Sequence, residues 1–193
     1  MARSPWWVLV GAVLIQGATS PGQTIGVSVF IDDMASDLDL SRSGISSAYL
    51  VGTVVGAIAM PAAGRLIDRR GLRFATLLFG GLFGAVLIAM AGVAGFVTLA
   101  IGFAGTRAAG QGALTLTATT TVAVWFDEHR GLANGIKTAS GGALMALAPI
   151  ASSALIATYG WRTSWVVLGI GAWLIVIPLG LWLVRNPALP GRR

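Results

Sequence analysis

Six long apolar runs, each almost free of charge, constrain the fold of this chain more than any other feature. A helix needs roughly 20 apolar residues to cross the hydrocarbon core of a bilayer, and the strict alternation of barrel strands is missing. The predicted membrane-spanning helices are Trp6–Phe30, Gly44–Leu66, Phe74–Val93, Phe96–Trp125, Gly131–Ala157 and Thr163–Val184. We therefore predict an all-α integral membrane protein, with residues 1–185 in one six-helix bundle and residues 186–193 in a short basic tail.

The low content of charge excludes an ordinary soluble domain. Only 10% of the residues are charged, whereas soluble domains carry about a quarter. A secreted protein with a signal peptide would also begin with an apolar run, but here such runs continue along the chain. The absence of cysteine excludes disulfides and thiolate metal sites. The sequence predicts no catalytic, metal or cofactor site, and its net charge of +6 does not indicate nucleic acid, because the basic residues gather on one membrane face.

The distribution of lysine and arginine sets the orientation. If the N-terminus is cytoplasmic, ten of the 13 basic residues belong to the inner side, two to the outer side, and Arg107 lies within a span. The inner set is Arg3, Arg65, Arg69, Arg70, Arg73, Arg130, Lys137, Arg185, Arg192 and Arg193, and the outer pair is Arg42 and Arg162. We expect both termini in the cytoplasm, the four aspartates of the first loop outside, and the chain in the inner (plasma) membrane of a bacterium.

The two halves of the chain resemble each other weakly. Residues 44–73 and 131–162 both open with glycine, are rich in small residues and end in Gly-x-Arg. Each contains a proline, Pro61 or Pro149, twelve or thirteen residues before that arginine. Three spans separate the copies, so they have opposite topology, as in many secondary transporters. This pattern predicts a 3+3 inverted repeat, and chance similarity between glycine-rich helices is the alternative.

The stretch "GRLIDRRGLR", residues 64–73, resembles the loop pattern G-x-L-x-D-R-x-G-x-R of the major facilitator superfamily. "RAAGQG" in the fourth run resembles a second pattern of that superfamily. "SPGQTIGVSVFIDDM", "WFDEHRGLANGI" and "YGWRTSW" resemble its oxalate/formate antiporter and monocarboxylate transporter branch. The resemblance implies a membrane secondary transporter, not an enzyme, that moves small organic anions such as mono- or dicarboxylates by alternating access.

The resemblance covers the N-terminal six-helix half of a twelve-helix fold. It implies that a second six-helix half completes the cavity, and we expect this partner to be a second copy of the chain, giving a homodimer of half-transporters. Two alternatives stay open. In the first, the chain is a truncated or engineered half that inserts and folds without transporting. In the second, it is a membrane scaffold that does not transport.

By the same resemblance, five residues of the loop form a conformational latch: Gly64, Asp68, Arg69, Gly71 and Arg73. The aspartate of this motif lies near a helix N-terminus of the opposite half, where the helix dipole favours a carboxylate. A simple topology anchor is the alternative. It explains the arginines, but it does not explain why an acid lies at the membrane surface.

Polar stripes mark a candidate substrate pathway. Thr119 and three of the candidates recur at intervals of four in the fourth run and share one face of an α-helix. The candidates are Arg107, Gln111 and Thr115 of the fourth run, Gln16, Ser20 and Gln23 of the first, where Pro21 and Gly22 allow a bend, and Tyr49 and Thr53 of the second. An arginine at this depth must face protein or water. One interpretation is that Arg107 holds an anionic substrate, because guanidinium suits carboxylates, or governs gating beside it. The alternative is a structural role, in which Arg107 binds backbone carbonyls of neighbouring helices.

Two further cationic residues and two rival functions complete the predictions. We expect Lys137 to snorkel to the inner surface and His129 to be a solvated loop residue. An aquaporin-like channel is disfavoured, because the single "NPA" triplet at residues 186–188 follows the last span. An intramembrane serine protease is disfavoured, because Ser140 in "TASGG" has no base within reach.

Overall fold

Helices account for almost all of residues 5–182, the range that the computed structural model describes. They are α1 (Pro5–Ala18), the 3-10 helix η1 (Ser20–Gly22), α2 (Thr24–Ser28), α3 (Ile31–Asp37), α4 (Arg42–Met90), α5 (Phe96–Gly105), the π-helix η2 (Thr106–Leu114), α6 (Thr115–Trp125) and α7 (Arg130–Trp182). No strand occurs in this range, which confirms the all-α prediction for it. The end of the sixth predicted run and the tail 186–193, with its "NPA" triplet, lie outside the described residues.

Both long helices, α4 and α7, fold back on themselves at a single glycine. Gly71 has φ 83° and ψ 164°, and Gly160 has φ 78° and ψ 161°. Glycine enters this left-handed region without the steric penalty of a Cβ. The sequence placed loops of several residues here, whereas helix runs up to each glycine and resumes directly after it. Each long helix is therefore a pair of limbs, residues 42–70 and 72–90 in α4, and residues 130–159 and 161–182 in α7.

The first and fourth predicted runs depart from regular α-helix. The expected bend at Pro21 and Gly22 is present as η1, after which Gln23 is extended. Helix continues beyond the first run, because α3 contains three of the four aspartates that the sequence assigned to a loop. In the fourth run the backbone passes from α5 through η2 to α6 without a break.

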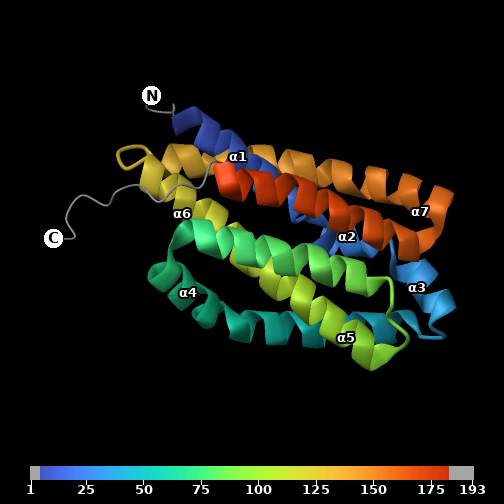
Figure 1. Cartoon of the computed structure of the whole chain (residues 1–193). Helices are drawn as coiled ribbons and strands as arrows, with labels where there is room; N and C mark the ends of the chain where they lie inside the picture. The colour runs from blue at the N-terminus through green and yellow to red at the C-terminus, as the bar shows by residue number, and fades with distance from the viewer. Residues whose placement is uncertain (1–4, 183–193) are drawn as a thin grey trace.

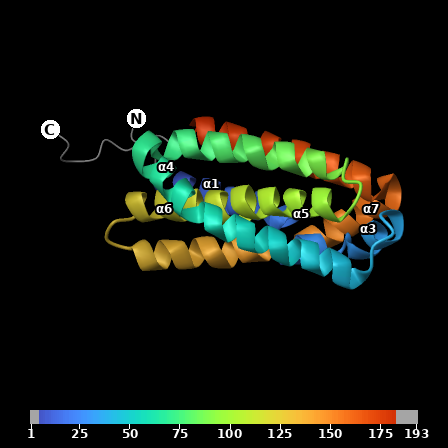
Figure 2. The same cartoon turned by 90° about the horizontal axis from the view of Figure 1, so that it is seen from below.

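We call the run of α1, η1 and α2 the first rod, and the run of α5, η2 and α6 the second rod. These rods and the limbs of α4 and α7 lie along one long axis (Figures 1 and 2). The start of α1, the turn of α4 at Gly71 and the end of α7 lie at one end of the molecule (Figure 1). We call this the Gly71 end. The opposite end holds α3, the connection between α4 and α5, and the turn of α7 at Gly160 (Figure 1). We call it the Gly160 end.

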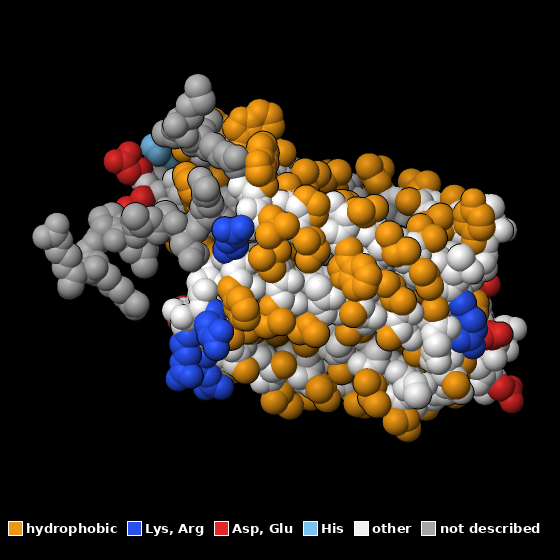
Figure 3. Space-filling model, viewed as in Figure 1, with side chains coloured by type: hydrophobic (Ala, Val, Ile, Leu, Met, Phe, Trp, Pro, Cys, Tyr) orange, Lys and Arg blue, Asp and Glu red, His pale blue; other side chains and the backbone are white. Residues whose placement is uncertain are grey.

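The middle of the molecule exposes apolar side chains, and the exposed charged residues lie at the ends. On the face drawn in Figure 3, hydrophobic side chains cover the central part, while blue and red residues gather at the two ends. Large aliphatic residues project outward from several rods, and Ile58, Ile150 and Leu174 are each at least 70% exposed. Within the described range, α4 and α7 are the helices long and apolar enough to cross a membrane. Each of their limbs is about 28 Å or longer at 1.5 Å per residue.

Aromatic residues from distant segments fill the core. Phe30 and Trp165 are fully buried and stack with ring centroids 4.3 Å apart. Trp173 of α7 donates from Nε1 to the Gly81 carbonyl, 2.9 Å away, across to the second limb of α4. The end of the first rod and the second limbs of α4 and α7 thus share one packed interior.

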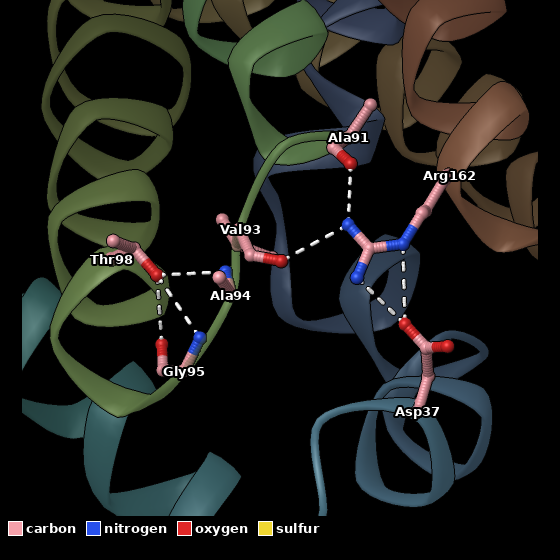
Figure 4. Close-up of polar contacts among 7 residues, drawn as sticks. All are labelled: Asp37, Ala91, Val93, Ala94, Gly95, Thr98 and Arg162. Carbon is pink, nitrogen blue, oxygen red and sulfur yellow. Dashed lines mark hydrogen bonds and ion pairs between the residues drawn. The ribbon is translucent and has the colours of Figure 1, made fainter.

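Arg162 ties three segments together at the Gly160 end (Figure 4). Its guanidinium donates to the Asp37 carboxylate at 2.7 and 3.2 Å, and to the carbonyls of Ala91 and Val93 at 2.6 and 3.0 Å. The same side chain lies over the Trp161 ring, 4.3 Å from its centroid. Beside it, Thr98 caps α5 by accepting from the backbone N–H groups of residues 94 and 95. One side chain therefore fixes the Gly160 turn against α3 and the connection after α4.

We expect Arg162→Ala to lower the free energy of unfolding by about 2–3 kcal/mol, because it removes charge-assisted hydrogen bonds and leaves two carbonyls without this partner. Arg162→Lys should recover only part of the loss, since an ammonium lacks the planar fork that reaches Asp37 and the carbonyls together. Equilibrium unfolding in mixed micelles checks this result. Arg42→Ala is the matched control, because the Arg42–Asp32 pair at the same end is 76% and 69% exposed. An equal loss in both variants would contradict the assignment.

Candidate functional site

The candidate site lies where the first limb of α4 crosses the end of α5 and η2. Gly52 and Gly56, one turn apart on α4, both face this contact. A Cβ on Gly52 would lie 2.6 Å from the Phe103 side chain, and a Cβ on Gly56 would lie 3.0 Å from the Cβ of Arg107. Because neither glycine has a side chain, the two backbones approach closely. The close crossing brings Arg107 against the polar residues of α4.

Arg107 is half-buried and is held by an aromatic side chain. Its Nη1 donates to the Tyr49 hydroxyl at 2.7 Å, and its Cζ lies 4.9 Å from the centroid of the same ring. The Tyr49 hydroxyl also shares a hydrogen bond of 2.8 Å with Thr24 Oγ1. Within residues 5–182, Arg107 makes no hydrogen bond to a backbone carbonyl. Hydrogen bonds between side chains therefore link Thr24 of α2, Tyr49 of α4 and Arg107 of η2. The other guanidinium N–H groups of Arg107 have no hydrogen-bond partner in the described range.

A cavity of about 180 Å³ opens beside this arginine. Its lining residues are Thr53, Gly56, Ala57, Met60, Arg107, Gln111 and Gly112. Gln111 Oε1 is buried there and has no hydrogen-bond partner among the described residues. Arg107 supplies the only charge in the lining. The Arg107 guanidinium gives the cavity a cationic donor, and the Gln111 amide can both donate and accept. The chemistry that the cavity suits best is the binding of a small polar anion.

A larger cavity of about 390 Å³ lies nearby, between the limbs of α4 and the α5–η2 rod. Its lining consists of glycine and apolar residues, with Leu66, Phe79 and Leu82 among them. It contains no group that could pair with a charged ligand. The smaller cavity at Arg107 is therefore the better candidate for an anion.

The π-helical segment changes which residues meet. In η2, hydrogen bonds skip one residue more than in an α-helix, so the α-helical register shifts between the residues within η2 and those that follow it. Arg107 and Gln111 face α4, whereas Thr119 faces α7 and Thr115 donates only to the Gly110 carbonyl, 3.5 Å away. The single polar face expected from the spacing is thus divided between two neighbours.

The polar residues of the first rod do not join the cavity. Gln16 is 7% exposed and lies against Gly141 of α7. Ser20 is buried in η1 and its Oγ has no partner in the described range. Gln23 donates to Thr19 Oγ1 at 3.3 Å. Of the predicted pathway residues, the structure brings together Arg107, Gln111, Tyr49 and Thr53.

Lys137 does not reach the surface, and this corrects the sequence expectation. Its residue exposure is 3%, and its Nζ donates to Thr119 Oγ1 at 2.6 Å. The side chain is enclosed because α1 and α6 pack on either side of the α7 face that carries it. His129 lies in the exposed turn between α6 and α7, as expected.

The predicted latch residues project from the Gly71 end. Asp68, Arg69 and Arg73 are exposed, and within residues 5–182 none of them makes a hydrogen bond or ion pair. A Cβ on Gly64 would meet nothing within 4 Å. Gly71 has the turn conformation described above. The motif is therefore presented on the surface without a partner inside the described part of the chain.

Sequence reasoning missed five residues of the site. Thr24 extends the hydrogen bonding of Arg107 and Tyr49, and the other four, Gly56, Ala57, Met60 and Gly112, line the cavity. The spacing of Gly52, Gly56 and Met60 by four was visible in the sequence, and it marks one face of α4. No sequence signal identified the contact of Thr24, because it depends on how the bend at η1 places α2.

Comparison with known proteins gives one family match and several distant relatives. The sequence profile of the Major Facilitator Superfamily matches residues 12–193. The chain is 25% identical to the oxalate:formate antiporter of Oxalobacter formigenes over 97% of the chain and 44% of that protein. It is 26% identical to monocarboxylate transporter 11 of Mus musculus, over 96% of the chain and 41% of that protein. It is 28% identical to the riboflavin transporter RibJ of Trypanosoma brucei brucei, over 81% of the chain and 29% of that protein.

The chain thus spans less than half the length of the curated relatives it matches. The profile match extends over nearly the whole chain, and the described part of it is helical apart from short connections. These findings agree with the family suggested by the Gly64–Arg73 motif. The chain belongs to the Major Facilitator Superfamily, a family of integral membrane transporters rather than enzymes.

Proposed function

We propose that the chain is one half of a secondary transporter that moves small organic anions, such as mono- and dicarboxylates, by alternating access. The observation that carries the proposal is the half-buried guanidinium of Arg107 beside a cavity of about 180 Å³. Guanidinium donors match both oxygens of a carboxylate. The cavity volume suits a ligand of a few heavy atoms. The names of the antiporter and monocarboxylate relatives describe cargo of this chemistry.

The two glycine turns support an inverted repeat within this half. Gly71 and Gly160 differ by 5° in φ and 3° in ψ. Gly71 lies ten residues after Pro61, and Gly160 lies eleven residues after Pro149. Each glycine is the first residue of a Gly-x-Arg sequence. Two copies of a bent rod followed by a folded helix, related by opposite topology, would give the 3+3 arrangement typical of secondary transporters.

The charges support an orientation with the Gly71 end in the cytoplasm. The described basic residues at that end are Arg65, Arg69, Arg70, Arg73 and Arg130, whereas the Gly160 end has Arg42 and Arg162 together with four aspartates. Cytoplasmic loops carry such an excess of basic residues. We place both termini in the cytoplasm and the chain in the inner membrane of a bacterium.

A second six-helix half would close the cavity, and we propose a second copy of this chain in the same orientation. The support is the unpartnered latch. Asp68 lies exposed at the end of a helix limb, where a helix N-terminus of another half would stabilise its charge. Cross-linking in the membrane through cysteines introduced at the Gly71 end measures this pairing, since the chain has no native cysteine. Monomers alone would contradict the homodimer.

Uptake into proteoliposomes tests the transport proposal. The purified chain is reconstituted, and uptake of labelled oxalate, formate and lactate is measured with and without the same unlabelled anion inside. We expect saturable uptake that internal anion stimulates and that a neutral analogue does not inhibit. A chain that folds and inserts but gives no uptake above protein-free liposomes would support the scaffold or inert-half alternative instead.

The latch makes a separate prediction at Asp68. We expect Asp68→Asn to lower uptake several-fold while the stability of the isolated chain changes by about 0.5 kcal/mol or less, because this exposed side chain makes no contact in the described range. Asp33→Asn makes the same chemical change on an exposed residue at the Gly160 end and should leave uptake unchanged. Wild-type uptake and wild-type cross-linking in Asp68→Asn would remove the latch role.

A further inference from the structure

A lysine is enclosed between three helical segments without a negative charge to balance it. Lys137, the one lysine of the chain, is 3% exposed. Its only hydrogen-bond partner within residues 5–182 is the neutral hydroxyl of Thr119, 2.6 Å from Nζ. An ammonium offers three donors, so two of them have no protein acceptor in the described range. A buried charge is strongly disfavoured unless it is paired.

No acid of the described chain can supply the missing charge. Asp32, Asp33, Asp37 and Asp39 belong to the Gly160 end, with Asp32 and Asp37 already paired with arginines. At the Gly71 end, Asp68 and Glu128 are exposed, and Asp127 is exposed and paired with Arg130. A group of opposite charge for Lys137 would therefore have to come from outside the described protein.

A second buried polar group lies one helical turn from this lysine. Gln16 of α1 is 7% exposed, and neither its Oε1, an acceptor, nor its Nε2, the donor that an anion could use, has a hydrogen-bond partner in the described range. Its amide lies against α7 at Gly141, where a Cβ would come within 2.9 Å of Nε2. Residues 137 and 141 share one face of α7, separated by about 6 Å along the axis. The same face of α7 thus meets an amide from α1 and a hydroxyl from α6.

We propose that Lys137, Thr119 and Gln16 form a second anion subsite, which binds a carboxylate of the transported substrate. This inference rests on the proposed transport function. The ammonium and the amide can each donate to a carboxylate oxygen, and the ligand supplies the charge that the protein lacks. Thr119 lies twelve residues after Arg107 on the same rod, and Arg107 faces the cavity beside α4 whereas Thr119 faces Lys137 of α7. We therefore place the two cations at successive stations on the path toward the Gly71 end.

The single lysine allows a direct measurement. The full chain is prepared in nanodiscs with lysine labelled by ¹³C at Cε, which gives one lysine side-chain signal, assigned by its loss in Lys137→Arg. Formate and oxalate are titrated, with chloride at equal ionic strength as the inorganic arm. We expect a saturable shift with the carboxylates and none of comparable size with chloride. A signal unmoved by carboxylates, or moved equally by chloride, would overturn the carboxylate subsite.

Two threonines of α6 provide a matched pair of variants. Thr119 and Thr121 both donate to the carbonyl four residues earlier, at 2.8 and 2.7 Å, but only Thr119 also accepts from Lys137. We expect Thr119→Val to weaken the carboxylate affinity about tenfold, since it removes a hydrogen bond to a charged group. Thr121→Val should leave the affinity within about twofold. Equal weakening in both variants would assign the effect to general packing and overturn the inference.

Failure of the subsite and failure of the transport proposal give different results. If the Lys137 signal responds to carboxylates but liposomes show no uptake, the subsite stands and transport falls. If the wild type transports and Lys137→Met transports equally well with the same half-saturating concentration, transport stands and the subsite falls.

Discussion

Replacing Arg107 with alanine should lower uptake of small carboxylates into proteoliposomes by about 10- to 100-fold, the loss expected when a charged hydrogen-bond donor to an anion is removed. Arg107 is the only charged residue lining its cavity, and Tyr49 holds it from one side only. The loss should appear mainly as weaker binding of the anion, because the guanidinium would contact the substrate from the moment it enters. Initial rates over a range of substrate concentrations measure this effect.

Two conservative variants separate anion binding from packing. Arg107→Lys keeps the charge but loses the planar fork and the stacking over the ring, so uptake should be intermediate. Tyr49→Phe removes the hydroxyl that Arg107 and Thr24 share but retains the ring under Cζ, so uptake should fall only a few-fold. Wild-type uptake in Arg107→Ala, with wild-type protein yield, would assign Arg107 to packing instead.

Replacing Trp165 with alanine should lower the free energy of unfolding by about 3–5 kcal/mol, the range for truncating a buried aromatic side chain. Trp165 is fully buried and stacks on Phe30, so its removal leaves a cavity where the first rod meets the second limb of α7. Trp165 Nε1 is buried without a partner in the described range. Trp165→Phe should therefore lose less than half as much, because it keeps a stacking ring and removes an unpaired donor.

Trp7→Ala is the matched control for this loss of an indole. Trp7 is 60% exposed on α1, so its truncation should change stability by about 0.5 kcal/mol or less. Unfolding followed by tryptophan fluorescence and circular dichroism in mixed micelles measures all three variants. Similar losses at Trp7 and Trp165 would contradict the importance of the Phe30–Trp165 stack.

Local patterns in the sequence predicted the helical class and the family. Long apolar runs predicted the all-α class, because a segment that crosses lipid has no water to bind its backbone polar groups and satisfies them within a helix. The motif from Gly64 to Arg73 identified the superfamily, because glycine, acid and base occur there in a fixed register. The position of the turns was predictable to within a few residues, since Gly71 and Gly160 are the residues that accept a left-handed conformation.

The composition of the site was only partly predictable. Spacing by four assumes regular α-helix, and η2 breaks that assumption by adding residues to each turn. For this reason Arg107 and Gln111 turn to α4 while Thr119 meets Lys137. The contact of Arg107 with Tyr49 joins residues 58 positions apart, and a single sequence contains no signal for such a pair.

The sequence by itself determined that this chain is built of apolar helices, where they turn and to which family it belongs, because these properties depend on short-range composition and on one compact motif. Only the tertiary structure decided that Lys137 is buried, that Arg162 joins three segments and that Arg107 shares a cavity with α4. The physical reason is that the environment of a charged side chain is set by the rods that pack around it. That packing depends on glycine contacts and helix bends that hydropathy along the chain does not encode.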